Sequence, residues 1–67
     1  MRDEEILHIF TEIAQGRGRH GSFLMAFAQA VMCADPSNFA LIRPFASVLI
    51  SKYGLEKYTV ELSERRV

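Results

Sequence analysis

Residues 20–55, HGSFLMAFAQAVMCADPSNFALIRPFASVLISKYGL, hold most of the apolar side chains of this 67-residue chain. The apolar residues recur at helical spacing, and Asp35-Pro36 divides the segment in two. Asp is a good N-cap, and proline in the first helical position loses no hydrogen bond. The sequence therefore predicts two core helices, over residues 22–34 and 36–53, joined by a tight turn.

The helix over residues 22–34 is expected to begin at Ser22, a favourable N-cap. It is apolar nearly all round, because Gln29 is its single polar side chain beyond the cap, and such a helix is buried on more than one side. One face combines aromatic rings with small residues that let a neighbouring helix approach closely. The residues of that face are Phe23, Phe27, Ala30 and Ala34.

The opposite face of this helix carries Met25, Gln29 and Met32. Flexible, polarizable methionines beside one amide are suited to docking a partner, and the open alternative is that the C-terminal segment covers them. Cys33 is expected to be a buried small hydrophobe. A reactive cysteine needs a nearby base, and His20 is about 18 Å away along the helix.

The helix over residues 36–53 is predicted to end at Gly54 and to be kinked or broken near residues 41–43, because Pro44 interrupts its pattern. Its apolar arc is about 200° wide on a helical wheel of 100° per residue. One neighbouring helix cannot cover so wide an arc. The arc comprises Phe39, Leu41, Ile42, Phe45, Ala46, Val48, Leu49 and Tyr53.

A first amphipathic helix is predicted over residues 3–15, with acidic residues in its first turn and Gly16 as the left-handed residue that ends it. Its apolar face consists of Ile6, Ile9, Phe10 and Ile13. Glu4, His8 and Glu12 recur on the other side. They are interpreted as a solvated polar face with a weak ion pair rather than as a metal or acid-base site.

The loop over residues 16–21, GRGRHG, is the one segment with distinct local chemistry. Its glycines let the backbone approach a ligand closely, and Arg17, Arg19 and His20 could hold an anion at the start of the next helix. It lacks the pattern of a P-loop or a dinucleotide fingerprint. A plain solvated interhelix loop and an anion or partner contact both remain open.

The tail, residues 56–67, alternates Tyr58, Val60 and Leu62 and is predicted to be a short extended arm. The fold class expected is therefore all-α: one small three-helix domain over residues 1–67, with its third helix kinked or broken at Pro44. At this length a chain buries only about 60% of the surface that it exposes when unfolded. Without a disulfide or zinc spacing as a staple, a homodimer is expected.

The composition narrows the classes of function. The chain is 49% hydrophobic and 24% charged, as in a globular domain, and its formal net charge of zero gives no long-range attraction to nucleic acid or anionic membrane. It has no apolar run long enough to span a membrane, and MRDEEI at its start is too acidic for a secretory signal. Together with one unbridged cysteine, these features predict a cytoplasmic protein.

The central segment resembles a group of small, functionally uncharacterised helical proteins encoded by bacteriophages and prophages. The resemblance covers about half of the chain and implies a phage context, in which such proteins occupy sites on host proteins, including defence machinery. It brings no established activity. The matching residues are Arg19-His20-Gly21, Phe23-Leu24, Ala26-Phe27-Ala28, Ala34-Asp35, Asn38-Phe39, Arg43-Pro44, Lys52-Tyr53 and Leu55.

These observations predict a non-enzymatic protein-interaction module that binds and occludes or remodels a host protein in the bacterial cytoplasm. No catalytic, metal or cofactor site is expected, because no nucleophile, base and oxyanion donors can be assembled. The alternative is nucleic-acid binding through the GRGRHG loop. A helix-turn-helix reader is disfavoured, because the third helix offers only Arg43 and Lys52 as basic side chains. The predicted partner-binding residues are Arg17, Arg19, His20, Met25, Gln29 and Met32.

Overall fold

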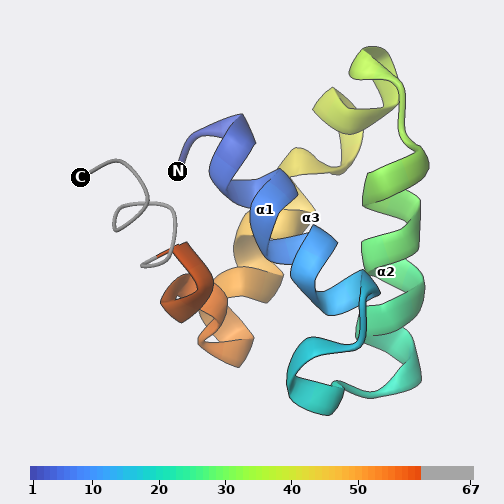
Figure 1. Ribbon diagram of the computed structural model, residues 1–67. Helices are drawn as coiled ribbons and strands as arrows, with labels where there is room; N and C mark the ends of the chain where they lie inside the picture. The colour runs from blue at the N-terminus through green and yellow to red at the C-terminus, as the bar shows by residue number, and fades with distance from the viewer. Residues whose placement is uncertain (60–67) are drawn as a thin grey trace.

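The computed structural model describes residues 1–59 and confirms the all-α fold with three main helices. Figure 1 shows α1 in the middle of the molecule, α2 beside it, α3 behind it and the C-terminal turn of the described chain on the other side. In the described residues, no helix is both long enough and apolar enough to cross a membrane. The elements are α1 (Asp3–Ala14), η1 (Arg17–Arg19), α2 (Ser22–Cys33), α3 (Pro36–Tyr53) and η2 (Leu55–Thr59).

Helix α1 is the centre of the core. The four predicted apolar residues, at three- and four-residue steps, are fully buried, so the expected inner face is confirmed. Glu5 begins the helix by accepting a hydrogen bond from the Arg2 backbone N–H at 2.9 Å. The helix ends at Ala14, one residue earlier than predicted, and Gly16 is left-handed at φ +92°, as expected of the residue that ends it.

Helix α2 buries a face that overlaps the predicted one at Phe27, which packs against the core, but is otherwise different. Leu24, Ala28 and Val31 pack into the core, whereas Phe23 is 61% exposed and Ala30 is also exposed. The predicted N-cap is also wrong, because Gly21 is the cap and Ser22 the first helical residue. A helix with apolar residues all round gives several equivalent choices of buried face, and packing against α1 decides among them.

Helix α3 runs without a break from Pro36 to Tyr53, which excludes the break near residues 41–43 and leaves the alternative, a kink, as a prediction. Pro44 lies on the exposed side of the helix. The lost N–H and the crowded carbonyl of the preceding turn therefore face solvent, where water can solvate them. Ala46 and Ile50 are buried on the inner side, and Gly54 ends the helix at φ +64°, as predicted.

Asp35 caps α3 as predicted, since its carboxylate accepts hydrogen bonds from the Asn38 backbone N–H at 2.8 Å and from the Ser37 hydroxyl at 3.1 Å. These bonds, the backbone one first, lower the pKa of Asp35 below its ordinary value of 3.8. The cap is therefore fully effective above that value and is lost as the pH falls through the lower pKa of the folded state.

We expect Asp35→Asn, which keeps a capping side chain but cannot titrate, to remove part of the acid sensitivity of the domain. The free energy of unfolding, measured by urea titration between about pH 5 and pH 2, should fall less in this variant than in the wild-type chain. Glu5 also has a lowered pKa, from the Arg2 hydrogen bond, so some acid sensitivity persists. If the free energy of unfolding falls equally with pH in the variant and in the wild-type chain, Asp35 is not a titrating cap.

The start of the tail is not the extended arm that alternation predicted. Residues 55–59 form the 3-10 helix η2, which packs on α1 and α3 and buries Leu55 and Tyr58. Two-residue alternation is weak evidence over so few positions, and the core contact of both side chains prevails over it. The rest of the predicted arm, residues 60–67, lies outside the described residues.

Candidate functional site

The GRGRHG loop closes over Tyr58, a residue nearly forty positions further along the chain. The His20 imidazole Nε2 and the Tyr58 hydroxyl lie 2.9 Å apart, with the two rings edge to face. Gly18, at φ +79°, has no room for a β-carbon, which would clash with the Tyr58 hydroxyl and the His20 ring. At Gly18 the absence of a side chain therefore lets the loop backbone approach side chains of the same chain closely.

Two cationic side chains lie close to the Tyr58 ring. The Arg17 guanidinium carbon lies 4.8 Å from the ring centroid, and the Lys57 ammonium nitrogen lies 5.6 Å from it. Both distances suit a cation–π interaction. We call Arg17, Gly18, His20 and Tyr58 the Tyr58 clasp. It gives two of the predicted partner-binding residues, Arg17 and His20, a structural role in joining the loop to η2.

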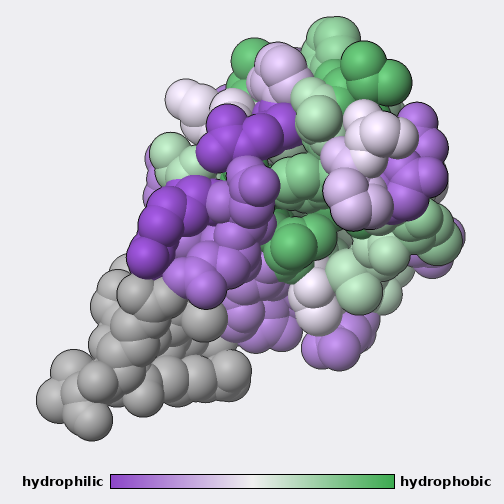
Figure 2. Space-filling model, turned by 90° about the horizontal axis from the view of Figure 1, so that it is seen from above, coloured by the Kyte–Doolittle hydropathy of each residue, from purple (hydrophilic) through white to green (hydrophobic). Residues whose placement is uncertain are grey.

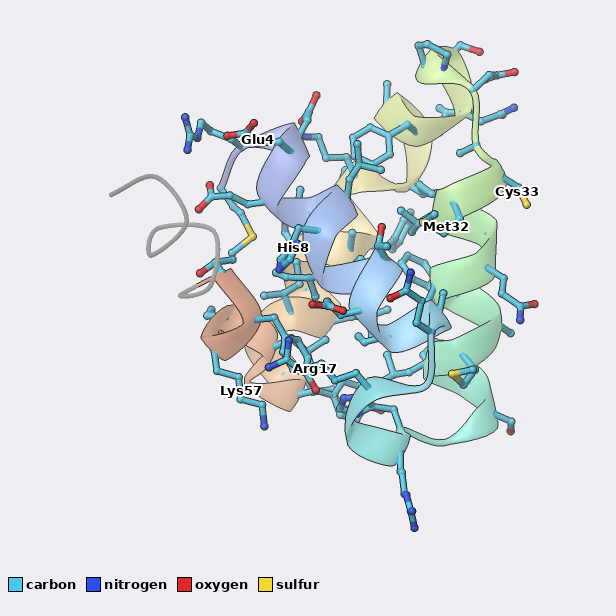
Figure 3. The ribbon with its side chains drawn as sticks, viewed as in Figure 1. Glu4, His8, Arg17, Met32, Cys33 and Lys57 are labelled. Atoms are coloured by element: carbon cyan, nitrogen blue, oxygen red, sulfur yellow. The ribbon has the colours of Figure 1, made fainter. Side chains whose placement is uncertain are left out.

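The clasp continues onto α1. Glu12 accepts a hydrogen bond from Arg17 Nη1 at 3.0 Å, and its carboxylate lies 3.8 Å from His8 Nε2 (Figure 3). The predicted solvated polar face is therefore wrong at these two positions, because the His8 and Glu12 side chains are only 14% and 18% exposed. The loop and η2, which both pack on α1, exclude the water that an isolated helix would have there.

His8 Nε2 is buried and has no hydrogen-bond partner among the described residues, although the Glu12 carboxylate lies 3.8 Å away. Glu4, the third member of the predicted face, is exposed and pairs with Arg2 at 3.1 Å. Among residues 1–59, no group of three or more histidine, cysteine, aspartate or glutamate side chains is arranged to hold a metal. His8 and Glu12 on α1 thus extend the Tyr58 clasp through Arg17.

The six predicted partner-binding residues fall into four groups. Arg17 and His20 belong to the clasp. Met25 is half-buried and packs against the core. Met32 is exposed yet points toward α1, where its sulfur lies 3.1 Å from the Thr11 hydroxyl oxygen (Figure 3). Arg19 and Gln29 are exposed, so the six residues do not form one continuous site.

A surface that the sequence did not single out lies on the outside of α2. Cys33 is exposed and points away from the other helices, so the expectation of a buried cysteine is wrong (Figure 3). It lies on the side of α2 opposite the buried face. We call this surface the outer α2 face; its exposed members are Ser22, Phe23, Ala26, Gln29, Ala30 and Cys33.

A second apolar surface lies on the outside of α3. Leu41, Phe45 and Val48 are 70%, 64% and 63% exposed, at helical steps of four and three residues. We call these three side chains, with the neighbouring Pro44, the outer α3 face. The predicted apolar arc of α3 was an indication of this surface, because an arc of that width is too wide for the core to bury all of its side chains. Figure 2 shows hydrophobic residues gathered over part of the face that is seen from above, beside hydrophilic ones.

The cavity lined by Met1, Ser47, Ile50, Ser51 and Glu56 measures about 200 Å³. This volume is below the roughly 300–1,000 Å³ of typical small-molecule sites. Cys33 and His20 lie at opposite ends of α2, so the helix itself separates this potential nucleophile from that base. The outer helix faces are therefore the strongest candidates for function. No protein-family model, curated protein or solved structure matches the chain.

Proposed function

We propose that this chain is a non-enzymatic protein-interaction module whose outer α2 face binds a helix of another protein. One observation carries the proposal: α2 has no charged side chain from Ser22 to Cys33, although about half of its circumference faces solvent. Water-facing sides of helices normally carry charged and polar residues. An uncharged exposed face is typical of a surface that is covered in use.

The chemistry of this face suits a helical partner. Ala26 and Ala30, one helical turn apart, let a second helix approach closely, and Phe23 supplies a large exposed ring beside them. Aromatic and arginine side chains contribute most strongly to interfaces. Arg19 lies just before α2, is exposed, and adopts a left-handed backbone at φ +50°, which costs about 1–2 kcal/mol for a residue with a side chain. It is the polar contact that we assign to this face.

The class of target follows from the resemblance to small phage proteins. A chain of this kind would act on a host protein, including a component of host defence, by occluding or remodelling its surface. Occlusion suits such a domain, because its uncharged helix face can occupy a groove on the target that would otherwise bind another helix. The bacterial cytoplasm is the proposed location.

Nucleic-acid binding through the GRGRHG loop is the competing proposal. Arg17 is paired with Glu12, and Arg43 donates hydrogen bonds to the Asp3 carboxylate and the Met1 carbonyl. Each of these cations would have to leave its partner before it could neutralise a phosphate. Binding of a labelled single-stranded or duplex oligonucleotide that weakens steeply with salt would favour this alternative.

The proposal is tested by a photo-reactive amino acid, p-benzoylphenylalanine, placed at position 30 and irradiated in bacterial cells. We expect one cross-linked adduct with a protein other than the chain itself, resistant to nuclease, because Ala30 lies within the outer α2 face. Adding Phe23→Asp should reduce the adduct at least tenfold, since a buried unpaired carboxylate is strongly unfavourable at an interface.

The matched control carries the same photo-reactive residue at Gln15, an exposed position between α1 and the loop. This control should give no adduct of that mass. The proposal is wrong if position 30 gives no adduct, if Phe23→Asp leaves the adduct unchanged, or if nuclease removes it. Far-UV circular dichroism of the Phe23→Asp chain establishes that a lost adduct does not reflect unfolding.

A further inference from the structure

The outer α3 face is the most exposed apolar surface among the described large side chains. Leu41, Phe45 and Val48 follow the spacing of a coiled-coil seam, and Lys52 continues the same spacing at the end of the helix. These three side chains expose on the order of 400 Å², about half of the 800 Å² that each partner contributes to a standard interface. Exposure of this extent is at the scale of functional patches on monomers.

The charges around this face have a simple pattern. From Pro36 to Tyr53 there is no acidic residue, and the basic residues are Arg43 and Lys52. Arg43 is held toward the N-terminus of the chain by Asp3. The seam therefore has one cation at its C-terminal end, Lys52, and one anion just before its N-terminal end, the capping carboxylate of Asp35.

We propose that the outer α3 face binds the same face of a second copy of the chain, with the two α3 helices antiparallel across a two-fold axis. In this register Leu41 faces Val48 of the second copy, and the two Phe45 rings meet near the axis. Lys52 then faces Ser37 of the second copy, within reach of its Asp35 carboxylate. A parallel pair would instead place Lys52 against Lys52.

Self-association explains features that another occupant would not. The face is self-complementary, because its opposite charges lie at opposite ends and its middle is neutral. Lys52 currently lies with its ammonium nitrogen 5.4 Å from the Tyr53 ring, which is 42% exposed, so it can turn to a new partner without leaving a buried site. The surface is also distinct from the outer α2 face, so a dimer keeps two α2 faces for other proteins.

Sedimentation equilibrium on the full chain over a range of concentrations tests the dimer directly. We expect a concentration-dependent rise from the monomer mass of 7.6 kDa to twice that mass. Phe45→Asp should raise the dissociation constant at least 100-fold, because it places two carboxylates near the axis. The matched control, Phe23→Asp, changes an equally exposed phenylalanine on α2 and should leave the dissociation constant unchanged.

A charge-swap pair tests the antiparallel register. Lys52→Glu should raise the dissociation constant about tenfold by facing Asp35 of the second copy, and adding Ser37→Lys should restore it within about threefold. In a parallel dimer Ser37→Lys would not rescue Lys52→Glu, because the two positions would lie at opposite ends of the pair.

The inference is overturned if the chain stays monomeric at millimolar concentration, or if Phe23→Asp rather than Phe45→Asp disrupts the dimer. It is also overturned if Ser37→Lys fails to rescue Lys52→Glu. Failure of this inference is distinguishable from failure of the proposed function. The cross-linking test detects an adduct between the outer α2 face and another protein, whereas the α3 variants change the dissociation constant of the dimer.

Discussion

Phe10→Ala is expected to leave the domain largely unfolded at room temperature. Phe10 is fully buried in α1, and its ring packs edge to face against Phe27, with the centroids 5.3 Å apart. Truncating a buried phenylalanine costs about 3–5 kcal/mol. A core in a chain of this length rarely supplies more than about 3–5 kcal/mol in total. Far-UV circular dichroism in a urea titration should therefore show little native baseline.

The matched control is Phe23→Ala, the same chemical change at a residue that is 61% exposed. Phe23 contacts the same Phe27 ring, at a centroid distance of 6.5 Å, but from the outside of α2. We expect a change in the free energy of unfolding within about 0.5 kcal/mol, as for most surface substitutions. Similar losses in the two variants would contradict the burial of the inner face of α1.

Gly18→Ala is expected to have the second-largest effect, a loss of about 3 kcal/mol in the free energy of unfolding. Alanine at φ +79° costs about 1–2 kcal/mol of backbone strain, and its β-carbon would displace the Tyr58 hydroxyl and the His20 ring. Opening the Tyr58 clasp loses the hydrogen bond between these two side chains and exposes a buried aromatic ring. Urea titration followed by circular dichroism measures the loss.

Gly16→Ala is the control that measures backbone strain without opening the Tyr58 clasp. Gly16 has a similar left-handed backbone, at φ +92°, but a β-carbon there would meet nothing within 4 Å. Only the strain of about 1–2 kcal/mol should remain. If the two alanine variants lose the same stability, the close approach of Gly18 to Tyr58 does not hold.

Most helix boundaries were predictable because they depend on local chemistry, although Gly21 rather than the predicted Ser22 caps α2. The Asp35-Pro36 cap and Gly54 fixed both ends of α3, and Gly16 fixed the end of α1 to within one residue. The inner face of α1 was predictable as well, because its isoleucines and phenylalanine are segregated from polar residues. Local signals of this kind act within one or two helical turns and need no tertiary information.

The surfaces were less predictable, because they depend on how the helices pack. An apolar helix such as α2 does not specify which side faces α1, so Phe23 and Cys33 were expected to be buried and are exposed. The role of His20 depends on Tyr58, far along the chain, and no local pattern indicates that contact. Of the three loop glycines, only Gly18 makes a close approach, to the Tyr58 and His20 side chains, whereas a β-carbon at Gly16 or Gly21 would meet nothing within 4 Å.

The structure and the two proposals together assign separate roles to three parts of the domain. The Tyr58 clasp joins the basic loop to the C-terminal turn. Under the two proposals, the outer α3 face would pair two copies and the outer α2 face would bind another protein. Two α2 faces on one dimer would bind a target with two sites more tightly than a monomer could, provided that their spacing matches the target. This arrangement would let a small domain with modest contact area compete for a host surface.

The most direct measurement is an isotope-filtered NOE experiment on a mixture of ¹³C-labelled and unlabelled chains. It detects only contacts between different copies, and side-chain signals of Leu41, Phe45 and Val48 identify the face in contact. We predict intermolecular NOEs between Leu41 methyls and Val48 methyls, together with NOEs between the Phe45 rings. Intermolecular NOEs confined to Phe23 and Ala30, or none at concentrations near 1 mM, would contradict the antiparallel α3 dimer.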